Sequence, residues 1–188
     1  MSRTGSTGRA GNRPALLVVD PQVGVLAGAW RRDETIAAVS ALIGRARATG
    51  SPVIWVRHDD EWLPAGSGQW QIVPELAPMP DEPVIAKNYG DAFAGTGLEQ
   101  LLARSGAGGI VLCGAQSDAC IRSTLNGALY RGIPVTLAAD AHTTVDRRAM
   151  GAGFGPEHAV ELVNLMAAYT VLPGIGSRLA PAAELFAS

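Results

Sequence analysis

Cysteine is scarce in this sequence, the charges nearly balance, and no long apolar run is present. The two cysteines, Cys113 and Cys120, are too few for a disulfide framework and lack the C-x-x-C spacing of a redox or zinc pair. A formal net charge of −2 gives no general attraction to nucleic acid or anionic lipid. No segment is apolar over the roughly 20 residues that a bilayer span needs. We therefore expect reduced thiols, no nucleic-acid partner and no membrane partner.

The first 13 residues contain very few apolar side chains. They are mainly Ser, Thr, Gly, Arg and Asn, a composition that predicts a disordered tail and lacks the apolar core of a signal peptide. We therefore expect a cytoplasmic protein. Of the whole 188-residue sequence, 47% is hydrophobic, which suits one globular domain of ordinary size. Residues 14–188 are predicted to form that single domain.

Beyond the tail, short β-rich runs alternate with helical windows. This alternation is typical of parallel strands joined by crossover helices. We expect an α/β protein with a three-layer Rossmann-like fold, whose mostly parallel central sheet has the order 3-2-1-4-5-6 and is flanked by helices. The expected strands are 15–20, 52–57, 84–87, 109–114, 134–139 and 170–172. The expected helices are 33–49, 96–104, 117–131 and 156–168.

Several expectations concern the ends of these elements and the segments between them. Asp33 is the predicted N-cap of the first helix, and Thr96 with Glu99 predicts a capping box at the start of the second. The stretch 58–83 is rich in Pro and Gly, which indicates a functional loop such as a lid or a subunit contact. Residues 173–188 are predicted to be loop with one weak helical turn.

Three residues with chemically active side chains follow predicted strands. Asp20 ends the first strand, Lys87 ends the third, and Cys120 comes just after the fourth. In open parallel sheets, ligands bind in the crevice outside the carboxyl ends of the strands. We therefore expect Asp20 and Cys120 to face one another there, with Lys87 beside them.

The three side chains suit nucleophilic catalysis. Cys120 is predicted in the first turn of a helix, where unpaired amides and the helix dipole favour a thiolate. Asp20 is positioned to take the thiol proton and return it to a leaving amine, while Lys87 stabilises both anions. The backbone amides of Gln116 and Cys120 are candidates for an oxyanion hole. The alternatives are a core cysteine and an acid that caps a turn; Cys113, inside a strand, is interpreted as core filling.

Ordered motifs around these residues resemble a known family. They are Leu17-Val18-Val19-Asp20-Pro21-Gln22, Trp70-Gln71-Ile72-Val73-Pro74-Glu75-Leu76, Lys87-Asn88-Tyr89-Gly90-Asp91-Ala92-Phe93, and Gly114-Ala115-Gln116-Ser117-Asp118-Ala119-Cys120. In order and spacing, from about residue 15 to 144, the chain resembles the isochorismatase-like cysteine hydrolases, which include nicotinamidases and related amidohydrolases. The resemblance implies an Asp20-Lys87-Cys120 triad, a thioester route, a cis peptide before Gln116 and a homo-oligomer, a homodimer or larger.

The sequence also departs from parts of that family. Nicotinamidases carry a metal site built from an Asp-x-His pair and a further His, whereas the corresponding segment here begins Arg57-His58-Asp59-Asp60. We therefore expect neither a metal nor another cofactor, and not nicotinamide as substrate. Isochorismatases proper cleave a vinyl ether without a nucleophilic cysteine. Cys120 thus favours the amidohydrolase branch.

Five further residues lie near the proposed crevice in sequence. Gln22, Trp62, Trp70, Tyr89 and Phe93 are candidates for substrate binding. Packing is the alternative for the aromatic residues, and satisfying backbone groups is the alternative for Gln22. His142 and His158 have no partner evident from spacing and are interpreted as structural.

Three functions remain open at this point. The first is a cysteine hydrolase that cleaves an amide or related C–N bond of a small molecule through a covalent thioester. The second is an isochorismatase-type ether hydrolase that uses Asp20 and Lys87 without covalent catalysis. The third is a catalytically silent binding protein of the same fold. The sequence does not identify the natural substrate, because specificity depends on the shape of the pocket.

Overall fold

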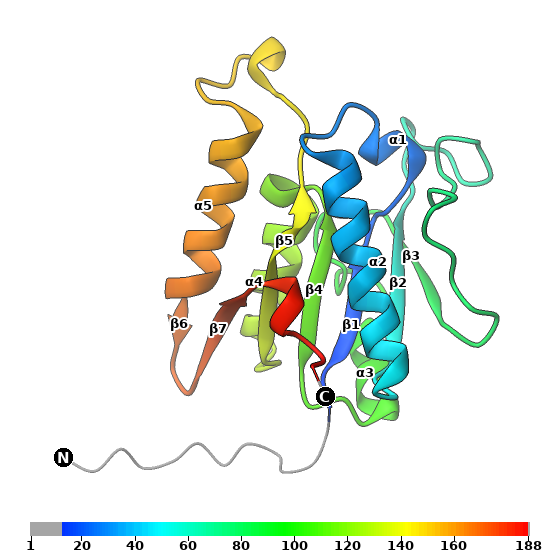
Figure 1. Ribbon diagram of the computed structural model, residues 1–188, viewed down its shortest axis with the longest axis vertical. Coiled ribbons are helices and arrows are strands. Elements are labelled where there is room, and N and C mark those ends of the chain that lie inside the picture. The colour runs from blue at the N-terminus through cyan, green and yellow to red at the C-terminus, as the bar shows by residue number, and fades with distance from the viewer. Residues whose placement is uncertain (1–12, 188) are drawn as a thin grey trace.

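A seven-stranded sheet forms the centre of the molecule, which we describe from a computed structural model covering residues 13–187 (Figure 1). Its order is β3-β2-β1-β4-β5-β7-β6. Neighbouring strands are parallel except β6 and β7, which pair antiparallel. The strands are β1 (Ala15–Val19), β2 (Val53–His58), β3 (Val84–Lys87), β4 (Ile110–Ala115), β5 (Val135–Thr143), β6 (Val171–Leu172) and β7 (Ile175–Ala180). The expected α/β fold is confirmed, whereas residues 1–12 of the predicted tail lie outside the described part.

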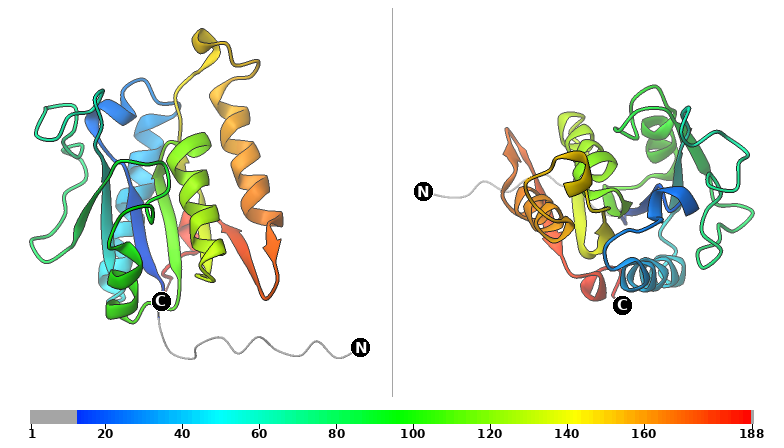
Figure 2. Two further views of the ribbon diagram at one scale, coloured as in Figure 1. Left: turned by 180° about the vertical axis from the view of Figure 1, so that it is seen from behind. Right: turned by 90° about the horizontal axis from the view of Figure 1, so that it is seen from above.

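Helices cover both faces of the sheet (Figure 2). They are α1 (Val23–Leu26), α2 (Arg32–Ala48), α3 (Leu98–Ser105), α4 (Arg122–Tyr130) and α5 (Pro156–Tyr169), with the short turns η1 (Ser117–Ile121), η2 (Arg148–Met150) and η3 (Ala182–Glu184). Helix α2 and turn η3 lie on one face, and α3, α4 and α5 lie on the other. Within the described part, no helix combines the length and apolarity needed to span a membrane.

The central strands are apolar on both faces because both faces are covered. All five residues of β1 are fully buried, with Leu17 and Val19 in the core under α3 and α4 and Leu16 and Val18 in the core under α2. A continuous apolar run is the expected sequence of such a strand. Burial of these side chains, each contributing about 1.5–3 kcal/mol when fully removed from water, fixes the register on which the site depends.

The predicted edge of the sheet is wrong in one respect, because β7 inserts between β5 and β6. The segment 173–188 was expected to be loop with one weak helical turn. A short turn is present at Ala182–Glu184, but Ile175–Ala180 forms a strand that pairs in parallel with β5. None of its six residues is fully buried, and Gly176, Ser177 and Arg178 interrupt any apolar run. A tight connection containing Gly174 at φ +80° turns the chain from β6 into β7. Tertiary pairing, rather than local pattern, makes this strand.

Two predicted helix caps also differ in the structure. Helix α2 begins at Arg32 with Arg31 as its N-cap, so Asp33 lies in the first turn. Helix α3 has Gly97 as its N-cap, although the hydroxyl of Thr96 still accepts a hydrogen bond from the Leu98 amide at 3.3 Å. The negative charge of Asp33 stabilises helix α2, because an acid near the N-terminus interacts favourably with the helix dipole.

The long connection between β2 and β3 contains no helix or regular strand over residues 59–83 of the described chain. It is nevertheless tied to the start of α1, because the amides of Val23 and Gly24 donate to the carbonyls of Gln71 and Gln69. This places the connection beside the residues that follow β1. Its proposed role as a lid or subunit contact stays a prediction.

Candidate active site

Asp20, Lys87 and Cys120 meet at the carboxyl edge of the sheet. Asp20 directly follows β1, Lys87 is the last residue of β3, and Cys120 lies in η1 immediately after β4. The Lys87 ammonium donates to Asp20 Oδ2 at 2.7 Å and to Cys120 Sγ at 3.2 Å. Asp20 and Lys87 are almost completely buried, and Cys120 is partly buried. The three residues predicted from their positions after strands therefore share one site.

Close approach of β1 and β4 shapes the backbone at this site. Asp20 has φ +49°, and its amide donates to the Val56 carbonyl at 2.9 Å. Gly114 has φ +116°, and a Cβ there would lie 2.0 Å from the Val19 carbonyl oxygen. Only glycine fits this position, because any side chain would overlap the backbone of β1. The two strand ends can therefore bring Asp20 and the segment after β4 together.

The turn that carries Cys120 starts from a cis peptide bond between Ala115 and Gln116, as the family resemblance implied. The Gln116 carbonyl accepts hydrogen bonds from the amides of Ala119 and Ile121, the two neighbours of Cys120. The Gln116 side chain donates to the Val25 carbonyl and accepts from Arg147. Both backbone and side chain of Gln116 thus anchor this turn.

The two acids of the site compete for one ammonium. Burial raises the pKa of Asp20 from its usual range, and the nearby Lys87 charge opposes that shift. Burial and the Asp20 charge raise the pKa of the Cys120 thiol to about 12, again against Lys87. A single Lys87 cation balances only one anion, and the raised pKa of Cys120 favours its thiol form over the thiolate. Burial and the Asp20 charge thus act on Cys120 in the direction opposite to the one expected from the helix start.

Labelling of Cys120 by iodoacetamide is expected to depend on pH. Only the thiolate reacts, so a pKa of about 12 predicts slow labelling at neutral pH and a rate that rises by about tenfold per pH unit below that value. Cys113 should be spared because it is fully buried and burial raises its pKa even further. Intact mass and peptide mapping measure both sites, with Cys113→Ala as the matched control. Equal labelling of both cysteines, or a rate independent of pH, would contradict this assignment.

His58, which was predicted to lie in the long loop 58–83, is part of this site. It is the last residue of β2 and pairs in register with Lys87 of β3. Its Nδ1 lies 3.1 Å from Lys87 Nζ, and its Nε2 lies 3.0 Å from Asp60 Oδ2. The predicted strand 52–57 ended one residue too early. Extending it by one residue would have put His58 at the same sheet edge as Asp20 and Lys87.

The side chains of Asp20, His58 and Cys120 also form a set of possible metal ligands. One ligand atom from each lies within 4.8 Å of the others. The Lys87 ammonium, however, contacts all three residues at 2.7, 3.1 and 3.2 Å. A cation in that position would be repelled by the ammonium and would have to displace it. The donor set therefore does not fit a metal while Lys87 is charged, and the expected absence of a metal stays a prediction.

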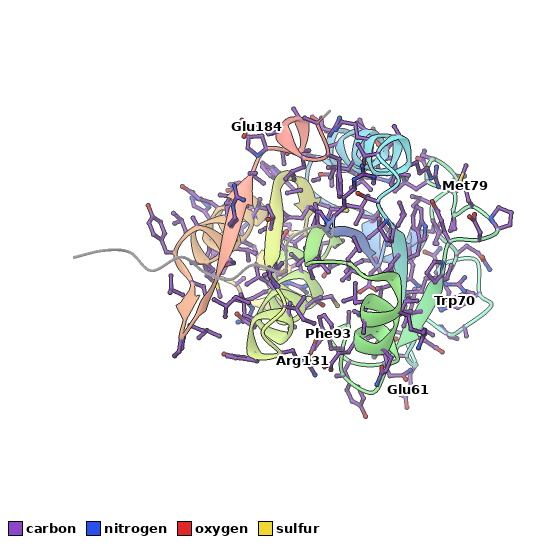
Figure 3. All side chains as sticks on the ribbon, turned by 90° about the horizontal axis from the view of Figure 1, so that it is seen from below. Glu61, Trp70, Met79, Phe93, Arg131 and Glu184 are labelled. Carbon is purple, nitrogen blue, oxygen red and sulfur yellow. The ribbon has the colours of Figure 1, made fainter. Side chains whose placement is uncertain are left out.

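The five residues predicted to contact substrate differ in how deeply they are buried. Gln22 is fully buried, and its amide donates to the carbonyls of His58 and Trp70 and accepts from the His58 amide. Phe93 is buried in the core, with the Arg131 guanidinium over its ring at 4.9 Å (Figure 3). Backbone satisfaction and packing, the alternative interpretations, describe these two residues.

The other three aromatic candidates are more accessible. Trp62 is 91% exposed and Tyr89 is 64% exposed. Trp70 is half-buried, and the guanidinium of Arg57 stacks on its ring at 3.6 Å from the centroid. Substrate contact stays a prediction for Trp62, Trp70 and Tyr89.

A buried polar chain supports the turn of Cys120 from the opposite side. Ser117 Oγ lies 2.8 Å from His142 Nδ1, and His142 Nε2 lies 2.9 Å from Asn164 Oδ1. Burial lowers the pKa of His142, which keeps the ring neutral. This chain connects η1 to β5 and α5, which agrees with the structural interpretation of His142. Ser117 is fully buried, and its hydroxyl is engaged with His142.

Two pockets lie away from the three converging side chains. One of about 280 Å³ is bordered by Trp30, Asp140, His142 and Asn164, and one of about 140 Å³ by Pro14, Ile110 and Pro134. Neither is lined by Asp20, Lys87 or Cys120. The cluster of Asp20, Lys87 and Cys120 is therefore identified by its hydrogen bonds and its burial, not by a pocket.

Comparison with known proteins gives a consistent result. The family model described as "Isochorismatase domain" matches residues 14–163. A streptothricin hydrolase of Streptomyces noursei is 36% identical over 140 residues, covering 70% of this chain and 55% of that protein. An N-carbamoylsarcosine amidase of Arthrobacter sp. is 31% identical over 153 residues, covering 65% and 56%. The chain therefore spans about half the length of these curated relatives.

A solved structure shows the same arrangement over nearly the whole chain. The crystal structure of an isochorismatase from Pseudomonas putida KT2440 superposes with a TM-score of 0.81 at 27% identity, covering 95% of each chain. The likeness covers a larger share of the chain than the segment 14–163 that the family model matches.

Proposed function

The chain belongs to the isochorismatase family, and from that premise we propose that it is a cysteine hydrolase that cleaves an amide or related C–N bond of a small molecule. The proposed triad is Asp20, Lys87 and Cys120. The observation that carries the proposal is the buried ammonium of Lys87 in contact with both Asp20 and Cys120. The names of the relatives support the bond type, because an N-carbamoylsarcosine amidase and a streptothricin hydrolase are among them.

In the first half of the proposed reaction, Cys120 attacks the substrate carbonyl carbon. Asp20 takes the thiol proton as the C–S bond forms, aided by a carboxylate oxygen, Oδ1, that is buried without a hydrogen-bond partner in the described chain. Lys87 stabilises whichever of the two acids is anionic. The carbonyl oxygen becomes an oxyanion, which the backbone amides of Gln116 and Cys120 are proposed to bind. The C–N bond then breaks, and Asp20 returns the proton to the leaving nitrogen.

The second half regenerates the enzyme. Water attacks the thioester carbon and gives a proton to Asp20, the C–S bond breaks, and Asp20 reprotonates the departing Cys120 thiolate. The products are a carboxylic acid, or a carbamate for a urea-like substrate, together with an amine or ammonia. The raised pKa of Asp20 suits this role, because a base that accepts and returns a proton works best when its pKa is close to the working pH.

Covalent catalysis is expected to leave a trappable intermediate. With a panel of small amides, ureas and lactams, acid quenching during turnover should give an acyl adduct on Cys120 by intact mass and peptide mapping. Added hydroxylamine should divert that thioester to a hydroxamate, because it competes with water for the acyl carbon. Cys113→Ala is the matched control and should retain the adduct. Amide turnover with no adduct and no hydroxamate would contradict the covalent route. Without amide turnover, hydrolysis of a vinyl ether would favour the ether hydrolase, and no turnover of either class would favour a silent binding protein.

The remaining expectations extend this proposal to the environment of the protein. We propose a homo-oligomer working in the cytoplasm without a resident cofactor, with no nucleic-acid or membrane partner. Exposed apolar side chains on α5 are available to a second subunit, including Leu162, Leu165 and Tyr169.

A further inference from the structure

His58 and Asp60 form a hydrogen-bonded pair directly behind Lys87. A lysine ammonium has three N–H donors and no acceptor. Those of Lys87 have three neighbours, Asp20 Oδ2 at 2.7 Å, His58 Nδ1 at 3.1 Å and Cys120 Sγ at 3.2 Å. The family-based triad accounts for two of these contacts. The third, to His58, has no role in the reaction as proposed above.

Two independent contacts determine the same tautomer of His58. Its Nδ1 faces an ammonium, which only donates, so Nδ1 must carry a lone pair. Its Nε2 faces a carboxylate oxygen of Asp60, which only accepts, so Nε2 must carry the proton. The imidazole in this arrangement is neutral and is protonated on Nε2. A ring protonated on Nδ1 would point a hydrogen at the ammonium.

Both members of the pair are themselves held in place. The other oxygen of Asp60 accepts hydrogen bonds from the amides of Trp62 and Leu63, each at 2.8 Å. The His58 backbone is clamped by the Gln22 side chain, which accepts from the His58 amide and donates to its carbonyl. The imidazole is thus fixed at its backbone and at its outer nitrogen. Its lone pair has a defined direction toward Lys87.

We propose that His58 is a positioning residue whose neutral imidazole, oriented by Asp60, accepts the third N–H of Lys87 and holds the ammonium between Asp20 and Cys120. This inference rests on the proposed cysteine hydrolase function. Without the imidazole, the ammonium is free to turn toward Asp20, its shorter contact, and away from the sulfur. A neutral acceptor suits this place, because a third acid would compete with Cys120 for the same cation. The charged or titratable groups around the ring are Lys87, Asp20, Cys120 and Asp60.

The inference is tested first by kinetics. His58→Leu removes the acceptor and should lower kcat by roughly 10–100-fold with little change in KM, the usual cost of losing a group that orients a catalytic residue. His58→Asn offers an amide oxygen near the position of Nδ1 and should restore much of kcat. His158→Leu, which removes an exposed histidine, is the matched control. Thermal unfolding of each variant separates loss of fold from loss of position. A His58→Leu enzyme with unchanged kcat would overturn the proposal.

The tautomer gives a second readout that does not depend on turnover. Nitrogen-15 NMR of the ring should show His58 neutral and protonated on Nε2. In Asp60→Asn, the Nε2 proton loses its charged acceptor while Lys87 still requires a lone pair on Nδ1, so the ring should stay protonated on Nε2 with a weaker hydrogen bond. Iodoacetamide labelling of Cys120 should change in His58→Leu and recover in His58→Asn. If the enzyme turns over no amide, the proposed function fails while these measurements still decide the role of His58. A wild-type ring protonated on Nδ1 would contradict it.

Discussion

Replacing Cys120 by alanine is expected to reduce amide hydrolysis by about 10³-fold or more, because the variant cannot form the thioester on which the proposed route depends. Residues that act as one catalytic unit lose most of their rate when any member is removed. The measurement is kcat/KM for amine or ammonia release on the best substrate of an amide and urea panel. The cavity left by the substitution is small, since Cys120 is only partly buried and alanine differs by one sulfur atom.

Cys113→Ala is the matched control for this experiment. Cys113 is fully buried in β4, and its sulfur contacts only the Leu17 carbonyl at 3.7 Å among the hydrogen bonds of the described chain. Its replacement should leave kcat/KM close to the wild-type value. Full activity in Cys120→Ala would remove the covalent mechanism. If ether hydrolysis then survived in Cys120→Ala and was lost in Asp20→Ala, the non-covalent isochorismatase route would replace it.

Replacing Lys87 by methionine should affect both activity and stability. Methionine fills a similar volume but leaves the buried Asp20 carboxylate without its counter-ion, and breaking a buried ion pair in this way costs about 3–5 kcal/mol. Catalysis should fall together with stability, because neither Asp20 nor Cys120 then has a cation beside it. Chemical denaturation gives the unfolding free energy, and the same preparation gives kcat/KM.

The stability loss in Lys87→Met should depend on pH. Burial raises the pKa of Asp20, and Lys87 opposes that shift, so the variant should hold Asp20 with a still higher pKa. A group whose pKa is raised on folding contributes stability below its unfolded pKa and loses it as pH rises through the folded pKa. The deficit should therefore be small in acid and grow toward neutral pH. The double variant Asp20→Asn with Lys87→Met should recover much of the stability but none of the activity. A deficit that did not change with pH, or a double variant no more stable than Lys87→Met, would contradict this interpretation.

The sequence predicted the inner part of the fold well because those elements have strong local patterns. The runs that became β1, β2, β3, β4 and β5 are short and β-rich, and each ends at or near a residue of the site or its support. The order of these five strands agrees with the prediction, whereas β7 was not predicted because Gly176, Ser177 and Arg178 interrupt its apolar residues. Two helix starts were predicted incorrectly, because neither Arg31 nor Gly97 caps its helix with a side-chain hydrogen bond.

The residues of the candidate site could be predicted because the ends of the strands that carry them could be predicted. Asp20, Lys87 and Cys120 follow three strands of one parallel sheet, and parallel strands bring their carboxyl ends to one edge. The residues that contact substrate were not predictable in this way. Phe93 and Gln22 carry the same side chains whether they face substrate or core, and only the packing around them distinguishes the two.

By itself, the sequence determined which chemical groups stand at the carboxyl edge of the sheet, because periodicity and apolar runs place each strand end along the chain. Only the tertiary structure decided how those groups share a proton and a charge. Residues 20, 58, 87 and 120 are distant in sequence, and their contacts depend on the register of four strands. The raised pKa of Cys120 and the tautomer of His58 follow from burial and from atoms about 3 Å away, which no local pattern encodes.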